Sequence, residues 1–150
     1  MSALPDDVRA LLDGEDLEAR VGLTVELVTV DADGWPRVAL LSAGEIVAIG
    51  AERLRLALWP ASRSAANLER SGRALLALVW EGAAHRVGNE AARGPDIEVA
   101  GEARAAFDAR VRSVARDEVP YARLRTGITF ELPERAPVLA RWAAMVAAMR

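Results

Sequence analysis

The chain has 150 residues and a formal net charge of −3, and it contains no Cys, no Lys and a single His. These absences exclude disulfides, thiolate nucleophiles and cysteine-held metals, and they also exclude a lysine Schiff base and the lysine of a P-loop. One histidine cannot build a multi-histidine metal site within one chain. The sequence has no dense block of Arg, and nucleic-acid binding needs a basic footprint, so we expect no nucleic-acid partner.

The sequence pattern bears on membrane insertion, secretion and domain organisation. No apolar run reaches the roughly 20 residues that a membrane-spanning helix needs. Residues 1–7 carry two acids and a proline, which is unlike the basic start of a signal peptide. We therefore expect a cytoplasmic protein without a membrane partner, and a single domain over residues 1–150, because no repeat or linker divides the chain.

The first part of the chain predicts a helix followed by a meander of short strands. Pro5 suits a first helical position, and Val8 and Leu11 share one face of a helix over residues 5–20. From residue 23 onward apolar residues alternate, which is typical of a strand, and Asp33-Gly34 predicts a tight hairpin turn. The strands predicted in this meander cover residues 23–30, 35–42, 45–49 and 53–59.

The second part adds helices between and after further strands. Ser62 or Ser64 is a suitable N-cap for a helix that ends near Gly72, and the glycines of residues 81–95 predict a loop. The predicted helices cover residues 62–70, 107–114 and 135–149, and the predicted strands cover residues 73–80, 97–101 and 126–132. The sum is an α+β fold with a barrel-like antiparallel sheet of six to seven strands and flanking helices.

The chemistry of the chain concentrates where the strand before residue 60 gives way to a helix. Ser62 and Ser64 flank Arg63 at this point. Backbone N–H groups at a helix N-terminus attract anions, and a guanidinium can hold a phosphate through two bonds. The pattern predicts a phosphate pocket, but a capped helix with a solvated Arg63 has the same sequence. Both interpretations stay open on these residues alone.

The order of two motifs resembles the FMN-binding split-barrel family related to pyridoxamine-phosphate oxidase. Ser62-Arg63-Ser64, followed by Asn67-Leu68-Glu69 and an apolar strand, is similar to the Ser-Arg-Lys segment that closes on the FMN phosphate in that family. Residues 37–42, Arg-Val-Ala-Leu-Leu-Ser, are similar to its flavin-contacting strand. The resemblance extends over about residues 20–105 and implies an antiparallel split β-barrel.

The resemblance also implies a cofactor site built from these two segments. One group of residues would hold the FMN phosphate, and a second group would lie along the isoalloxazine ring and the ribityl chain. The phosphate group is Arg37, Ser62, Arg63 and Ser64; the ring group is the backbone of Val38, Ala39 and Leu40, with Leu58 and Trp59 beside them. A surface charge at Arg37, and core or dimer-interface packing at Trp59, are the alternative interpretations.

Several positions depart from the family pattern. Ser42 and Ser64 stand where the oxidases have lysines, so two cations are missing near the phosphate. Asp96 replaces a glutamine that contacts the flavin ring, and an acid there would repel an anionic reduced flavin. The C-terminal Arg-His-Arg signature for substrate is absent. The chain therefore resembles the fold and cofactor site of the family without resembling a true pyridoxamine-phosphate oxidase.

The resemblance implies a flavin-dependent oxidoreductase that binds FMN, or a related deazaflavin, at a homodimer interface and acts on a small-molecule substrate. Two other classes stay open: a protein that holds flavin or haem without turnover, and a split barrel that serves only as an interaction module. His85 is a candidate catalytic acid or haem ligand, although a locally bonded histidine is the more common situation. No metal site is expected. Trp142, Met145 and Met149 are expected to pack a C-terminal helix on the barrel.

Overall fold

The structure is a computed structural model that describes residues 3–150. Its strands are β1 (Val25–Val30), β2 (Pro36–Leu41), β3 (Ile46–Ala48), β4 (Arg53–Leu58), β5 (Arg73–Trp80), β6 (Ala83–Arg93), β7 (Ile97–Val99) and β8 (Glu102–Asp117). Its helices are α1 (Asp6–Leu11), α2 (Arg63–Ser71), α3 (Arg135–Met149) and the short 3₁₀ helix η1 (Leu17–Arg20). Met1 and Ser2, the start of the segment in which no signal peptide is expected, lie outside the described residues.

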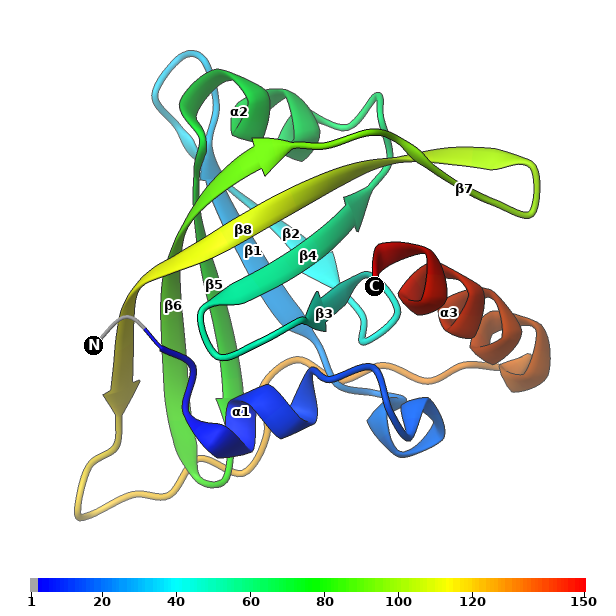
Figure 1. The fold of residues 1–150 in the computed structure, drawn as a ribbon. Coiled ribbons are helices and arrows are strands. Elements are labelled where there is room, and N and C mark those ends of the chain that lie inside the picture. Colours follow the sequence, from blue (N-terminus) through cyan, green and yellow to red (C-terminus); the bar gives the residue numbers. More distant parts are fainter. Residues whose placement is uncertain (1–2) are drawn as a thin grey trace.

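The strands form one strongly curled antiparallel sheet (Figure 1). Seven of them follow the order β2-β1-β5-β6-β8-β4-β3, and β7 pairs with β8. Strand β8 joins the two parts of the barrel, because β4 pairs with its residues 105–110 and β6 pairs on its other side with residues 107–117. Strand β2 lies at one end of this order and pairs with β1 alone. The predicted α+β split barrel with flanking helices is confirmed.

Alternating side chains give the barrel its core. In β1, Val25, Leu27 and Thr29 are buried, whereas Val28 and Val30 face the outer side, as the period of two in an extended strand requires. Helix α1 covers one end of the barrel and α2 covers the other (Figure 1), and buried apolar residues from both helices join the central cluster. The barrel is therefore closed at both ends by helices that are amphipathic.

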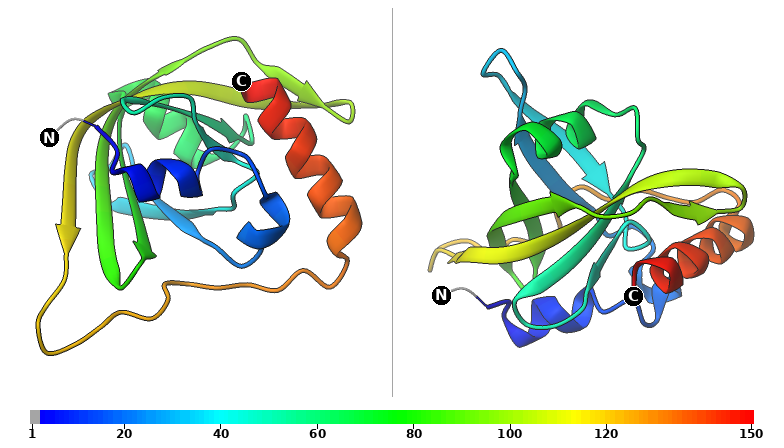
Figure 2. Two further views of the ribbon diagram at one scale, coloured as in Figure 1. Left: turned by 60° about the horizontal axis from the view of Figure 1, so that its bottom comes forward. Right: turned by 45° about the horizontal axis from the view of Figure 1, so that its top comes forward.

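Helix α3 packs on the outside of the barrel against β3, β4, β7 and η1. Trp142, Met145 and Met149 are buried there, so the expected packing of this helix is confirmed. The segment between β8 and α3 runs around the outside of the barrel before the helix begins (Figure 2). Among residues 3–150, no helix is long and apolar enough to span a membrane.

Most predicted elements are present, but the helix predicted over residues 107–114 is wrong. These residues belong to β8, in which Ala105, Phe107, Ala109 and Val111 point inward in strict alternation. Two of the four inward positions are alanines, so the apolar residues that stand out in the sequence have a helix-like spacing. Tertiary pairing with two neighbouring strands decides the conformation here.

Three other predicted segments differ from the structure. The predicted loop over residues 81–95 is wrong for most of its length, since residues 83–93 form β6. The sequence does not show the alternation of this strand, because the polar residues His85 and Asn89 occupy two of its buried inward positions. The strand predicted over residues 126–132 is wrong, since that segment is irregular and pairs with no strand. The helix predicted over residues 5–20 ends at Leu11. The chain then turns through Gly14, where φ is +80° and an added Cβ would lie 2.5 Å from Val146, before the short helix η1 begins.

Candidate functional site

The β1–β2 hairpin and helix α2 meet at one end of the barrel. Arg37 lies opposite Thr29 in the hairpin register, so both side chains project from the same face of the sheet. The Asn67 side chain on α2 donates a hydrogen bond to Thr29 Oγ1 at 3.0 Å. This bond ties the hairpin to the helix, and it places the two predicted phosphate-binding segments side by side.

The two arginines predicted to hold a phosphate converge on one carboxylate. Arg37 donates from Nε to Asp31 Oδ1 at 2.9 Å and from Nη2 to Asp31 Oδ2 at 3.2 Å. Arg63 Nη1 lies 3.8 Å from Asp31 Oδ2. A single oxyanion therefore lies within reach of both guanidinium groups, although the arginines are far apart in the sequence. The side chain of Arg63 is 73% exposed, which leaves most of its donors open to solvent.

Asp31 is the member of this cluster that sequence reasoning missed. Asn67 Nδ2 also donates to Asp31 Oδ1, at 2.8 Å. Hydrogen bonds from Arg37 and then Asn67 hold the pKa of Asp31 below its ordinary value of 3.8, and the same pairing raises the pKa of Arg37. The sequence contains one indication of this role: Asp31 stands at the start of the hairpin turn, six residues before Arg37. The carbonyl oxygen of Asp31 accepts a hydrogen bond from the Gly34 N–H at 2.8 Å, and Gly34 has a φ of +91°, so turn chemistry alone accounts for an aspartate at this position in the sequence.

The serines beside Arg63 have unequal positions. Ser62 is the N-cap of α2, where its Oγ accepts a hydrogen bond from the Ala65 N–H at 3.1 Å. The predicted cap is confirmed, and the hydroxyl hydrogen of Ser62 remains available to donate. Ser64 lies on the first turn of α2 and is buried. A phosphate-binding role for either serine stays a prediction.

The residues predicted to lie along a ring are divided between two faces of β2. Val38 and Leu40 are 55% and 54% exposed on the outer face, and Ala39 is half-buried on the inner face. Leu58 is buried at the end of β4. Trp59 is exposed, and the Arg104 guanidinium lies 3.6 Å from the centre of its ring. Packing of Trp59 in the core of this chain is therefore excluded, whereas a contact with a ligand or a second chain is open.

His85 and Asp96 lie outside this cluster. His85 is fully buried inside the barrel, and its Nε2 is 3.2 Å from the Trp80 carbonyl oxygen. The structure thus matches the locally bonded interpretation of His85, and its imidazole is not at the surface. Asp96 accepts a hydrogen bond from Arg93 at 2.7 Å, so its negative charge already has a cationic partner.

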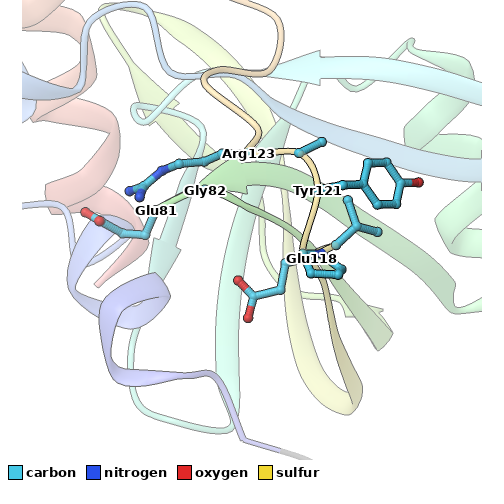
Figure 3. A pocket seen from close by; sticks show the side chains of 8 residues that line it. Glu81, Gly82, Glu118, Tyr121 and Arg123 are labelled. Carbon is cyan, nitrogen blue, oxygen red and sulfur yellow. The ribbon is translucent and has the colours of Figure 1, made fainter.

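Two surface hollows bear on where a ligand can bind. The first, about 370 Å³, is lined by Asp31, Asp33, Arg63, Asn67 and Arg70 beside the convergent arginines. A hollow of about 420 Å³ lies at the other end of the barrel, around the β5–β6 turn and residues 118–123. In Figure 3 the Tyr121 ring there points away from the carboxylates of Glu81 and Glu118. These exposed groups form no nucleophile–base arrangement, so the first hollow is the stronger candidate.

Solved structures establish the class of fold. A pyridoxamine 5'-phosphate oxidase-like protein from Lactobacillus delbrueckii superposes with a TM-score of 0.58 at 18% identity, covering 77% of this chain and 95% of that one. An FMN-binding protein from Syntrophomonas wolfei gives 0.51 at 17% identity, with coverage of 74% and 88%. A heme-binding protein from Mycobacterium smegmatis gives 0.53 at 14% identity, with coverage of 93% and 61%. The fold is the split barrel of the pyridoxamine 5'-phosphate oxidase-like proteins.

Sequence comparison then identifies the particular family within this class. No protein-family model matches the chain. The chain is 37% identical over 142 residues to the uncharacterized protein YclD of Bacillus subtilis (strain 168), a match that covers 95% of this chain and 92% of YclD. The chain therefore belongs to the same family as YclD, and its fold is the split barrel of the solved structures.

Proposed function

We propose that the protein binds FMN, or a deazaflavin of similar shape, along β2, and that it acts as a flavin-dependent oxidoreductase on a small molecule. The observation that carries this proposal is the convergence of Arg37 and Arg63 on the carboxylate of Asp31. Two guanidinium groups around one oxyanion form the donor arrangement that a terminal phosphate needs. The carboxylate of Asp31 marks the position at which such donors meet.

The charges of the surrounding residues fit a phosphate. Arg70 adds a third cation, donating from Nη1 to Asn67 Oδ1 at 3.1 Å, while Asp31 and Asp33 supply two negative charges to the lining of the hollow. Cations remain in excess. Arg37 also retains its Nη1 donors, because Asp31 accepts only from Nε and Nη2. A bound phosphate can thus share these arginines with Asp31 without displacing it.

Strand β2 supplies a surface for a flat ring beyond the phosphate. The Cα of Leu40 lies roughly 10 Å along the strand from that of Arg37, since the rise is about 3.3 Å per residue. Val38 and Leu40 are exposed on this stretch. The chemistry that a flavin supplies when bound is hydride or electron transfer, to which the protein adds position and electrostatics.

A homodimer is part of the proposal. Val30, Trp35, Val38 and Leu40 leave large apolar side chains exposed on the β1–β2 hairpin. Several large apolar side chains exposed on one hairpin are typical of a protein interface. A second copy seated on the hairpin would cover the patch and exclude water from a ring bound along β2. Sedimentation velocity of the purified protein is expected to give the mass of a dimer.

The test is the absorbance spectrum of the protein before and after addition of FMN, with Arg63→Gln beside the parent. Loss of a charged hydrogen-bond donor is expected to weaken FMN binding about tenfold or more. The matched control is Arg9→Gln, which changes an exposed arginine on α1 at the far end of the barrel. A protein that takes up no FMN would refute the flavin site, and the same titration with deazaflavin and with haem would then identify any replacement.

A second candidate function is a protein that holds flavin without turnover. The observation that favours it is the character of β2, where Val38, Ala39 and Leu40 offer only apolar side chains and backbone groups to a ring. Steady-state oxidation of a reduced nicotinamide by the FMN-loaded protein separates the two. Turnover supports the oxidoreductase, and tight binding without turnover supports the holding protein.

A further inference from the structure

A groove that shares only Leu40 with the proposed cofactor site lies near the other end of β2. We call it the α3 groove; it is bounded by residues 40–42, the irregular segment 128–132 and the first half of α3. Its volume is about 390 Å³, within the range of pockets that hold small molecules. Ser42 lies roughly 17 Å along the strand from Arg37, so the groove and the arginines are distinct sites on one strand.

The wall of the groove is aromatic and firmly placed. Trp142 packs edge-to-face against Phe130, with ring centroids 6.2 Å apart and an interplanar angle of 83°. The indole also lies directly on Gly44, where a Cβ would be 2.2 Å from Trp142 Cγ. Leu40 and Val138 complete an apolar lining. Such a surface favours a flat apolar ring, because aromatic faces and edges pack with specific geometry.

The floor of the groove carries a fixed acceptor. The Ser42 N–H and hydroxyl both donate to Glu45 Oε1, at 3.1 and 2.8 Å. These bonds hold the carboxylate in place and occupy one of its oxygens. Within residues 3–150, Glu45 Oε2 accepts no hydrogen bond from a side chain or from the Ser42 backbone. This oxygen is therefore free to accept a hydrogen bond from a ligand.

The rim of the groove carries a cation. Arg141 lines the groove and is exposed. Within the described part of the chain, the Arg141 guanidinium forms no ion pair, since no carboxylate oxygen lies within 4.0 Å of it. An unpaired guanidinium beside an apolar groove favours a ligand with a carboxylate, because the pair forms two charge-assisted bonds.

We propose that the α3 groove binds a small aromatic acid that also carries a hydrogen-bond donor, as the substrate of the oxidoreductase. The ring lies against Trp142, the acid pairs with Arg141, and the donor bonds to Glu45. The assignment as substrate rests on the proposed function, since Leu40 is shared between the groove and the stretch of β2 assigned to the flavin ring. Binding in the groove does not require flavin, so the two proposals can fail separately.

The experiment titrates flavin-free protein with 4-hydroxybenzoate and follows both heat and tryptophan emission. Saturable binding is expected, with an emission change that disappears in Trp142→Phe. Arg141→Gln is expected to weaken the binding about tenfold or more, because a charged hydrogen-bonded pair is lost. Arg135→Gln, an exposed arginine at the start of the same helix that does not line the groove, is the control and should bind as the parent does.

Two related compounds test the chemistry from the ligand side. The neutral 4-hydroxybenzyl alcohol should bind more weakly than the acid, and Arg141→Gln should not weaken it further. Benzoate, which lacks the donor, should also bind more weakly to the parent. Equal losses in the Arg141 and Arg135 variants, or an absence of saturable binding at millimolar ligand, would overturn the proposal.

A second copy of the chain is the competing occupant of the groove. If it fills the groove, Trp142 emission will change with protein concentration and will not respond to the acid, which also overturns the proposal. Binding of the acid in a protein that takes up no FMN leaves the groove assigned and removes the flavin site. Binding of FMN without binding of the acid supports the flavin site and overturns the assignment of the groove.

Discussion

Replacement of Gly44 by Ala tests the contact on which the position of α3 depends. An alanine Cβ at this position would lie 2.2, 2.3 and 2.7 Å from Cγ, Cδ1 and Cβ of Trp142. These atoms are the root of the indole side chain, so rotation of its outer end cannot remove the overlap. Trp142 is 4% exposed and packs edge-to-face on Phe130, so its side chain can move away from Gly44 only if it enters the groove that it lines or if the helix shifts.

The cost of this substitution follows from overpacking. Extra methyl groups in a closely packed region typically cost about 1–3 kcal/mol of the free energy of unfolding. The backbone itself contributes little, because Gly44 is absent from the positions with positive φ. With an m-value of about 2 kcal/mol/M in urea, the unfolding midpoint should fall by about 0.5–1.5 M. Trp142 must shift as well, so the near-ultraviolet circular dichroism should change.

The assay is equilibrium urea unfolding followed by far-ultraviolet circular dichroism, with Gly50→Ala as the matched control. An added Cβ at Gly50 meets nothing within 4 Å, and its φ is not positive. The control midpoint should therefore stay close to that of the parent. If the two variants unfold at the same urea concentration, the contact between Gly44 and Trp142 does not limit the position of α3, and the rigid wall inferred for the groove is wrong.

Two further predictions concern the other end of β2. Hydrogen bonds lower the pKa of Asp31 from 3.8, so the stability that the Asp31 carboxylate contributes is complete above pH 3.8 and is lost as the pH falls through the lower pKa of the folded state. A carboxyl-carbon NMR titration of Asp31 should give a midpoint below 3.8. A midpoint at or above 3.8 would contradict the pairing with Arg37. Ser62→Ala should lower the free energy of unfolding by about 0.5–2 kcal/mol, and Ser62→Gly by only a few tenths, because alanine removes the N-cap acceptor of α2. Urea unfolding measures both serine variants, and equal effects would argue against the cap.

The sequence predicts the elements whose apolar residues are themselves large. Strands β1, β3, β4 and β5 carry Val, Leu or Ile at most of their inward positions, and α3 carries Trp142 and Met145 on its buried face. The inward positions of β8 include Ala105 and Ala109, and those of β6 include His85 and Asn89. Alanine and polar residues give no alternating signal in a single sequence, although both can occupy an inward position when neighbouring strands fix the pairing.

The candidate site was predictable only in part for a related reason. Arg37 and Arg63 stand in motifs that resemble a known family, so they could be named together despite their separation in the chain. Asp31 stands in no such motif, and its role depends on Arg37 lying across the hairpin and on Asn67 reaching over from α2. Contacts of this kind arise from tertiary packing, and local sequence patterns do not encode them.

The position of β2 at the end of the sheet order connects the two proposed sites. An edge strand leaves alternate backbone N–H and C=O groups without partners in the sheet, and β2 pairs with β1 alone. Arg37 approaches this edge from the inner face, while Val38 and Leu40 line it from the outer face. A ligand lying along the edge can therefore contact the cation, the free backbone groups and the apolar side chains at once. The α3 groove begins where this edge ends, so the ligand proposed for the groove would lie beside the end of the flavin proposed along the edge.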